Sequence, residues 1–230
     1  HAPARRDPTR HDPVRAPRTG GPPRPSEIMA CVTTAAPTSP TLIVGLANPG
    51  PDYEGTRHNI GWEVLQELAS RALPMPASFS THKKTNCEIA QTRLADRPVV
   101  LARPRSYMNL SGGPTAAVAK YFSVAPTDVI VIHDEIDIDF GRVRLKRGGG
   151  EGGHNGLRSL SQSLGTRDYL RVRAGVGRPP GRMAVADFVL KRFSKLEQPD
   201  VPFLIQDAAD AVELLLTHGL ETAQNQLHSA

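Results

Sequence analysis

The chain has 230 residues, a formal net charge of +5 and 39% hydrophobic residues, which is enough for one well-buried domain. Its two cysteines, Cys31 and Cys87, support neither a disulfide framework nor a cysteine zinc site, and they suit a reducing cytoplasm. No run of about 18 apolar residues occurs, so we expect no membrane-spanning helix. Composition therefore excludes disulfide-stapled and membrane-spanning classes.

Residues 1–40 differ from the rest of the chain. They hold nine prolines, six arginines and three acidic residues, with no aromatic residue and no periodic apolar face. Such a segment cannot bury enough surface to offset the entropy of ordering, so we predict a disordered Pro/Arg-rich tail. The tail lacks the apolar core of a signal peptide, and Met29 is a candidate for the natural start. It carries about +3 of the net charge, so the predicted domain, residues 41–230, is only mildly basic.

Predicted strands and helices alternate along this domain. Apolar runs predict buried strands at 41–46, 129–132 and 169–176. Alternating basic residues predict a strand at 142–147, and a turn at 95–97 predicts a hairpin of the strands 86–92 and 98–102. Helical spacing predicts helices at 56–72, where Thr56 can act as the cap, and at 116–122, 155–164 and 202–216. We therefore predict an α/β fold: one domain with a mixed, mostly parallel twisted sheet surrounded by helices.

Polar residues follow three of these strands. Asn48 comes after the first strand, Met108 and Asn109 come after the hairpin, and Asp134 stands at the tip of the strand that begins at Val129. Ligands of such sheets bind outside the carboxyl ends of the strands. We expect these ends to converge on one edge of the sheet.

His58 is the strongest candidate for a general base. A lone histidine at the start of a helix is more often an exposed or capping residue. The presence of Asp134 at another strand end favours a general base instead. A carboxylate that holds one imidazole nitrogen leaves the other free to take a proton from water. We therefore predict a contact between His58 and Asp134.

Other chemistries fit less well. The acidic residues Asp134, Glu135, Asp137 and Asp139 offer a hard-cation site as an alternative, but no second ligand cluster stands out, and we expect no metal. The glycine run at 148–156 lacks the P-loop ending and the dinucleotide spacing, and no GxSxG motif is present. A serine nucleophile is therefore not indicated.

Three amide side chains, Asn48, Asn109 and Asn155, suit the orientation of a water and of an ester or amide substrate. Singly, each is more often a turn or cap residue. Basic side chains alternate along two predicted strands, where they suit either a solvated sheet face or phosphate contacts: Arg142, Arg144, Lys146, Arg147, Arg171 and Arg173.

Three long motifs follow one another along the chain. From Leu42 to Gly61 the sequence reads LIVGLANPG-x-x-Y-x-x-TRHNIG, and it continues with RPRSYMNLSGG and then VIHDEIDIDFGRVRLKRGGGEGGHNGL. These motifs, in this order, resemble those of a known family, bacterial peptidyl-tRNA hydrolase. The end, ETAQNQLHS, also resembles the family. The resemblance runs from about Thr41 to Ser229 and leaves the tail outside.

The resemblance implies a monomeric, cytoplasmic enzyme that needs no cofactor, membrane or obligate protein partner. It would cleave the ester between peptide and tRNA and so recycle peptidyl-tRNA from drop-off or stalled translation. It implies a catalytic His58 with Asp134 as its partner, Asn109 to position the water, and a mobile lid at 178–187. The implied substrate-binding residues are Asn48, Tyr53, Tyr107, Met108, His154 and Asn155, and those that grip the acceptor-stem backbone are Arg144, Lys146 and Arg173.

The sequence departs from the family pattern at two positions. Tyr107 stands where the family often has phenylalanine, and Glu151 places a carboxylate in the glycine loop, where it could weaken tRNA binding.

Two alternative functions are open. The main alternative is a non-catalytic RNA-binding protein on the same fold. The presence of all five predicted site residues argues against it: Asn48, His58, Asn109, Asp134 and Asn155. A small-molecule esterase is the weaker rival, because no nucleophile is found and two predicted strands are cationic.

Overall fold

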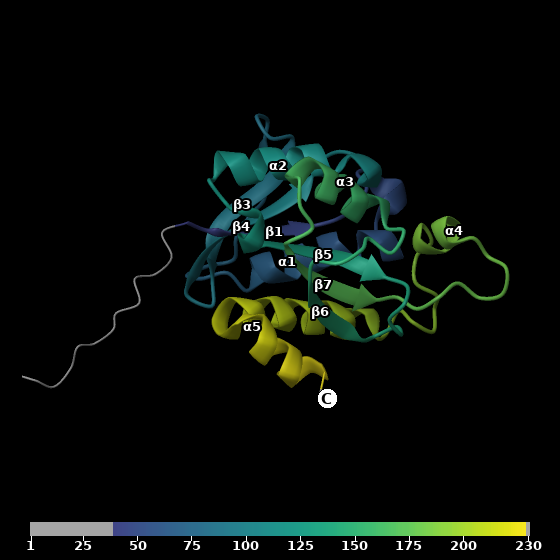
Figure 1. Cartoon of the computed structure of the whole chain (residues 1–230). Helices are drawn as coiled ribbons and strands as arrows, with labels where there is room; N and C mark the ends of the chain where they lie inside the picture. The colour runs from purple at the N-terminus through teal and green to yellow at the C-terminus, as the bar shows by residue number, and fades with distance from the viewer. Residues whose placement is uncertain (1–38, 229–230) are drawn as a thin grey trace, which may run out of the picture. The chain divides into compact units, whose positions relative to one another are not determined.

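The computed structural model describes residues 39–228 (Figure 1). Of the predicted tail, only residues 39 and 40 fall in this range, so the predicted disorder and the candidate start at Met29 lie outside the described residues.

One seven-stranded sheet organises the described residues, with the order β2-β3-β4-β1-β5-β7-β6. The four central strands β4, β1, β5 and β7 are parallel, while β2, β3 and β6 run antiparallel to their neighbours at the two edges. The predicted mixed α/β sheet is confirmed. The strands are β1 (Thr41–Gly45), β2 (Ser80–His82), β3 (Cys87–Leu94), β4 (Arg97–Pro104), β5 (Val129–Glu135), β6 (Val143–Arg147) and β7 (Leu170–Gly175).

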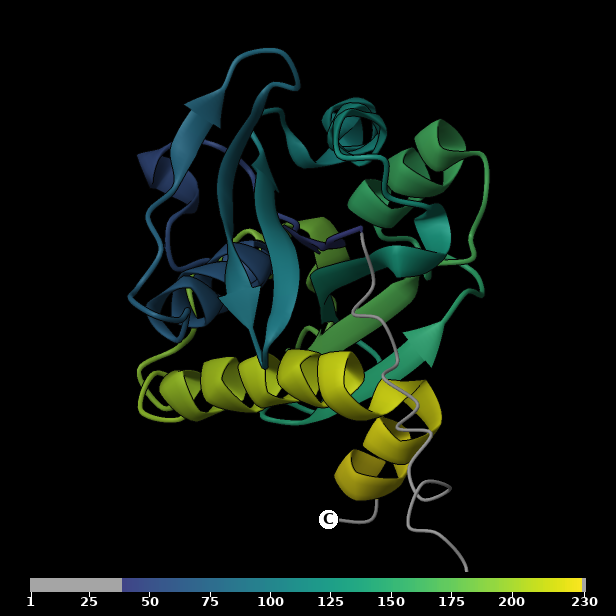
Figure 2. The same cartoon turned by 90° about the vertical axis from the view of Figure 1, so that its left-hand side faces the viewer.

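Helices cover both faces of the sheet. Helices α2 (Gly112–Tyr121) and α3 (Asn155–Leu164) lie on one face, and α1 (Ile60–Ser70) and α5 (Val201–His228) lie on the other (Figures 1 and 2). Alternate residues of β1, β4 and β5 enter two apolar cores. In β1, Leu42 and Val44 pack toward α2 and α3, and Ile43 packs toward α1 and α5. This two-sided burial explains the unbroken apolar runs of the central strands.

The predicted hairpin and the helix at 155–164 are confirmed. Strands β3 and β4 pair antiparallel, and Ala95 and Asp96 turn between them with φ angles of 47° and 58°. Helix α3 spans the predicted residues. The last helix, predicted at 202–216, continues to His228, and Gly219 interrupts it with a non-helical backbone.

Three local features differ from the prediction. The Thr56 hydroxyl does not cap a helix, because it donates to the Tyr53 carbonyl at 2.7 Å. Residues Arg57–Asn59 form a separate 3-10 turn before α1. Strand β2 and the five-residue helix α4 (Val185–Val189) were not predicted.

None of the helices within residues 39–228 is both long enough and apolar enough to cross a membrane.

Candidate active site

The carboxyl ends of β1, β4 and β5 meet at a cavity of about 480 Å³. The predicted convergence of these strand ends is confirmed, since Asn48, Asn109 and Asp134 all line this cavity. Other walls come from the turn before α1, from the glycine loop and from α4. They include His58, residues 151–155, Val185, Ala186, Val189 and Leu190.

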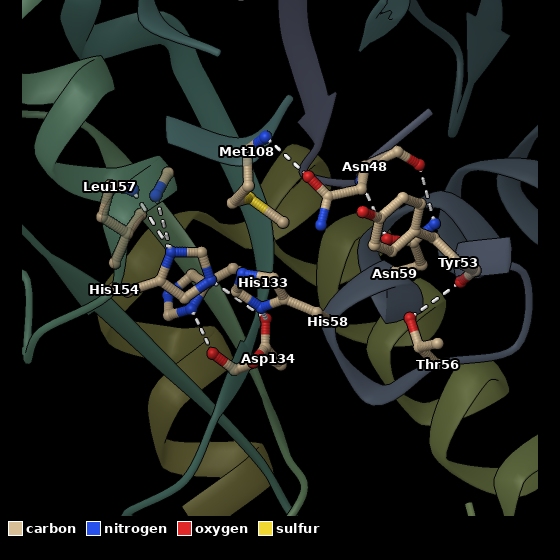
Figure 3. Close-up of polar contacts among 11 residues, drawn as sticks. Asn48, Tyr53, Thr56, His58, Asn59, Met108, His133, Asp134, His154 and Leu157 are labelled. Carbon is tan, nitrogen blue, oxygen red and sulfur yellow. Dashed lines mark hydrogen bonds and ion pairs between the residues drawn. The ribbon is translucent and has the colours of Figure 1, made fainter. Parts of the chain in front are cut away.

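His58 and Asp134 make the predicted contact (Figure 3). Nδ1 of His58 lies 2.9 Å from Oδ1 of Asp134, and the two side chains are 12% and 2% exposed. Close packing at Gly61 brings them together: a Cβ on this residue would lie 2.6 Å from the carbonyl oxygen of Ile132 and 2.7 Å from the amide nitrogen of Leu46. The start of α1 can therefore lie directly against β1 and β5. Because Nδ1 donates to the carboxylate, Nε2 is the nitrogen of His58 that can act as a base.

Asp134 also contacts a second histidine, His154. Nε2 of His154 lies 3.0 Å from the same Oδ1 atom, while its Nδ1 accepts from the backbone N–H groups of Gly156 and Leu157 at 3.1 and 3.3 Å. His154 is thus the N-cap residue of α3. Burial alone would raise the pKa of Asp134, but the two histidines outweigh burial and hold that pKa well below its usual range.

A third histidine, His133, lies beneath this pair, and no pattern in the sequence singled it out. Its side chain is buried, its Nδ1–H donates to the Asp134 carbonyl at 2.7 Å, and its ring centre lies 5.1 Å from that of His154. Burial, followed by the neighbouring His154, lowers the pKa of His133 to about 3. His133 is therefore neutral near pH 7 and packs behind His154, outside the cavity wall.

Asn48 is fixed in place by the backbone and by Asn59. Its Oδ1 accepts from the backbone N–H of Met108 at 2.8 Å. Asn59, which is 2% exposed, accepts from the Asn48 N–H at 2.8 Å and donates to the Asn48 carbonyl at 2.9 Å (Figure 3). These contacts leave the Nδ2 amide of Asn48 for a ligand. The role of Asn59 was missed, because an asparagine beside the candidate base has no distinguishing spacing.

The other predicted substrate-binding residues lie in or near the cavity. Met108, Asn109, His154 and Asn155 line it, and Asn109 and Asn155 are exposed. Tyr53 and Tyr107 are outside its wall and form an edge-to-face pair with ring centres 6.3 Å apart.

A family model described as peptidyl-tRNA hydrolase matches residues 42–230. The chain belongs to the peptidyl-tRNA hydrolase family. A peptidyl-tRNA hydrolase from Nocardia farcinica is 60% identical over 195 residues, which cover 85% of this chain and all of the relative. One from Rhodococcus opacus is 60% identical over 81% of this chain and 97% of the relative.

A solved structure gives the same result. The crystal structure of peptidyl-tRNA hydrolase from Acinetobacter baumannii matches with a TM-score of 0.75 and 34% sequence identity, over 82% of this chain and 94% of that chain. The chain is therefore an enzyme of the peptidyl-tRNA hydrolase family, and both the resemblance and the fold that it implied are confirmed.

Basic side chains from β6 and β7 share one face of the sheet in this member of the family. Arg144 lies opposite Arg173, and Lys146 lies opposite Arg171. Arg173 binds Glu135, with Nε at 3.1 Å from Oε2. Arg144, Lys146 and Arg173 are each partly exposed, so all three can reach a ligand.

Arg171 is different, because neither of the two open alternatives, a solvated sheet face or a phosphate contact, describes it. Its side chain is 2% exposed and donates to the carbonyl oxygens of Gly150 and Gly149 at 2.7 and 2.9 Å. It also contacts the Tyr169 hydroxyl at 3.3 Å. Arg171 therefore supports the glycine loop from behind.

Helix α4 and the following turn form the outer wall of the cavity, within and after the predicted lid at 178–187. Arg57, beside the candidate base, anchors this wall. Its buried guanidinium donates to the carbonyls of Lys191 and Arg192 at 3.2 and 2.9 Å and to Glu197 at 2.7 Å, and it lies 4.1 Å from the centre of the Phe188 ring. No pattern in the sequence predicted these contacts of Arg57.

The alternative metal site at the acidic strand tip receives no support from the side-chain contacts. Glu135 binds Arg173, and Asp137 pairs with Arg178. In the described part of the chain, one group of three side chains has possible metal-ligand atoms within 4.8 Å of one another, namely His58, Asp134 and His154. Because Nδ1 of His154 accepts from two N–H groups, its Nε2 carries the proton and has no lone pair for a metal ion. Hydrogen bonding accounts for all three side chains.

Proposed function

We propose that this enzyme hydrolyses the ester bond between the peptide and the terminal ribose of peptidyl-tRNA, and so recycles tRNA from drop-off or stalled translation. His58 would act as the general base, oriented by Asp134, with no covalent intermediate. The observation that carries this proposal is the 2.9 Å contact between Nδ1 of His58 and the buried Asp134 carboxylate, beside a cavity lined by three asparagines. It leaves the other ring nitrogen as the base.

In the first step, Nε2 of His58 takes a proton from a water molecule, and the water oxygen bonds to the ester carbonyl carbon. The negative charge moves to the carbonyl oxygen, and Asp134 stabilises the imidazolium that forms. In the second step, the carbon–oxygen bond to the ribose breaks, and the imidazolium returns its proton to the ribose oxygen. The products are a peptide carboxylate and a tRNA with a free terminal hydroxyl, with one further proton released to solvent.

The asparagines supply donors and acceptors around the reacting atoms. Asn109, exposed at the cavity rim, would position the water or stabilise the developing oxyanion. Asn48, held rigidly by Asn59 and Met108, would present its Nδ2 amide, and Asn155 would act with it to hold the peptide and ribose. Rigid support of this kind favours a precise attack geometry.

Binding of tRNA would use the basic face of β6 and β7. Arg144, Lys146 and Arg173 share this face and would grip the backbone of the acceptor stem, with the CCA end reaching the cavity. Tyr53, Tyr107, Met108 and His154 would contribute further substrate contacts. Residues 178–187 would act as a mobile lid.

We propose that the enzyme works as a monomer in the cytoplasm, where peptidyl-tRNA is produced, without a membrane, a cofactor or an obligate protein partner. All residues that the mechanism uses belong to one chain, so it requires no second copy.

The test is hydrolysis by the purified protein of N-acetyl-aminoacyl-tRNA and, in parallel, of free aminoacyl-tRNA, each with and without a chelator. We expect release from the blocked substrate only, at a rate that the chelator does not change. Binding of tRNA without release would overturn the proposal in favour of an RNA-binding protein. Loss of activity with the chelator would overturn the metal-independent mechanism.

A further inference from the structure

We infer that His154 is a positioning residue for the catalytic base: a neutral imidazole that holds Asp134 and shares its negative charge with His58. This inference rests on the proposed function. It differs from a role in substrate contact alone, because His154 would act on the reaction through Asp134.

The hydrogen bonds of His154 determine which of its nitrogens carries the proton. Its Nδ1 lies 3.1 and 3.3 Å from the N–H groups of Gly156 and Leu157, which can only donate. Nδ1 must therefore be an acceptor, and the single ring proton must be on Nε2. A second proton on Nδ1 would face two N–H donors at the positive end of helix α3, so the geometry opposes the imidazolium form.

The proton on Nε2 is directed at the catalytic carboxylate. Nε2 of His154 lies 3.0 Å from Oδ1 of Asp134, and Nδ1 of His58 lies 2.9 Å from the same oxygen (Figure 3). One carboxylate oxygen therefore accepts from two imidazoles, whose ring centres lie 4.9 Å apart. The side chains of Asp134 and His154 are 2% and 9% exposed, so little water competes for these bonds.

Other charged groups nearby are already paired. Glu135, next to Asp134 on β5, binds Arg173, and Glu151 of the glycine loop binds Arg167 with Nε at 2.7 Å from Oε1. His133, beneath His154, is neutral near pH 7, and Arg171 is directed at the glycine loop. Within this set, His154 and His58 are the two side chains that donate to Asp134.

Two consequences follow for the reaction. His154 fixes the position of Oδ1, and through it the orientation of the His58 ring. It also offsets part of the carboxylate charge, so that Asp134 stabilises protonated His58 less than an unshared carboxylate would.

The decisive variant is His154→Asn, which keeps an N-cap acceptor for α3 but is too short to donate to Asp134. We expect kcat to fall about 10-fold to 100-fold, a larger change than any rise in KM from a lost substrate contact. We also expect the acid limb of the kcat profile to move to higher pH, because Asp134 then holds the His58 proton more tightly. A rise in KM alone, with an unmoved acid limb, would overturn the inference and leave a substrate contact.

Folding is controlled with a second variant. His154→Ala removes both the cap and the contact with Asp134, so its thermal midpoint should fall below that of His154→Asn, while both show the same displaced acid limb. If His154→Asn recovers both stability and kcat, His154 acts only as a helix cap and the inference is wrong.

A readout that does not depend on turnover separates this inference from the proposed function. In nitrogen NMR spectra of the wild-type protein near pH 7, His154 should show a protonated Nε2 and an unprotonated Nδ1. The opposite tautomer, or a doubly protonated ring, would overturn the inference whether or not the protein hydrolyses peptidyl-tRNA.

Discussion

The buried His133 should make the stability of the fold depend on pH, and His133→Phe should remove this dependence. The pKa of His133 is about 3 in the folded protein, against 6.5 for an ordinary histidine. As pH falls below 6.5, the unfolded chain binds a proton that the folded protein does not bind until pH 3. The group therefore stabilises the fold fully above this window, and that stability is lost between pH 6.5 and 3.

The magnitude follows from the difference between the two pKa values. Each pH unit inside the window costs about 1.4 kcal/mol per proton, so the group should lower the free energy of unfolding by about 2 kcal/mol between pH 7 and pH 5. Phenylalanine keeps an aromatic ring against His154 but has no titrating nitrogen. The variant will be less stable at pH 7, because it loses the hydrogen bond to the Asp134 carbonyl.

The measurement is urea unfolding at pH 7 and pH 5 for wild type and His133→Phe. We expect wild type to lose about 2 kcal/mol more than the variant over this interval. His218→Gln, at an exposed position on α5, serves as the control and should retain the wild-type dependence. Equal losses in wild type and His133→Phe would refute the reasoning that His133 is held neutral.

Three further predictions concern binding and the cavity wall. Arg144→Gln should reduce the salt slope of tRNA affinity by about one phosphate contact, measured by titration at several salt concentrations, whereas Lys120→Gln at the end of α2 should leave it unchanged. Arg57→Met should release the segment after α4 and raise KM. It should also lower the free energy of unfolding by about 2 kcal/mol or more, because the hydrogen bonds of the buried guanidinium are lost. Unchanged protease sensitivity at residues 190–197 would count against this prediction. Glu151→Gln should tighten tRNA binding about 2-fold to 5-fold at low salt. It removes a carboxylate whose pKa Arg167 lowers to about 2, and it frees Arg167 to bind phosphate. Weaker binding would show instead that the ion pair positions the glycine loop.

The sequence was sufficient to predict the central sheet and the contact between His58 and Asp134. The run of β-branched residues from Val129 predicts a strand that is buried on both faces and therefore central in its sheet. Asp134 follows this run, so it was predicted at the end of a central strand. His58 follows the neighbouring strand, so topology brought the two side chains to one edge. The distance of 2.9 Å between them depends in addition on the close packing of Gly61 against β1 and β5.

The sequence could not separate residues with the same pattern and different surroundings. Arg171 and Arg173 alternate with apolar residues on one strand, yet Arg171 is buried beneath the glycine loop and Arg173 is partly exposed. Only the tertiary position of the loop distinguishes them. The short elements β2 and α4 were missed because three and five residues are too few to show a period.

The contacts of the other site residues also depend on tertiary structure. His154 precedes a helix, so a capping role was accessible in principle, but its contact with Asp134 joins segments 20 residues apart. Arg57 reaches carbonyl groups more than 130 residues away along the chain. Spacing in a single sequence contains no record of such pairs.

The role of His58 as the general base is tested best by the release rate of N-acetyl-aminoacyl-tRNA by His58→Ala under saturating substrate. We expect kcat to fall by a factor of about 10²–10⁴, with tRNA affinity and the thermal midpoint near their wild-type values. A folded His58→Ala protein that turns over within a few-fold of wild type would contradict it.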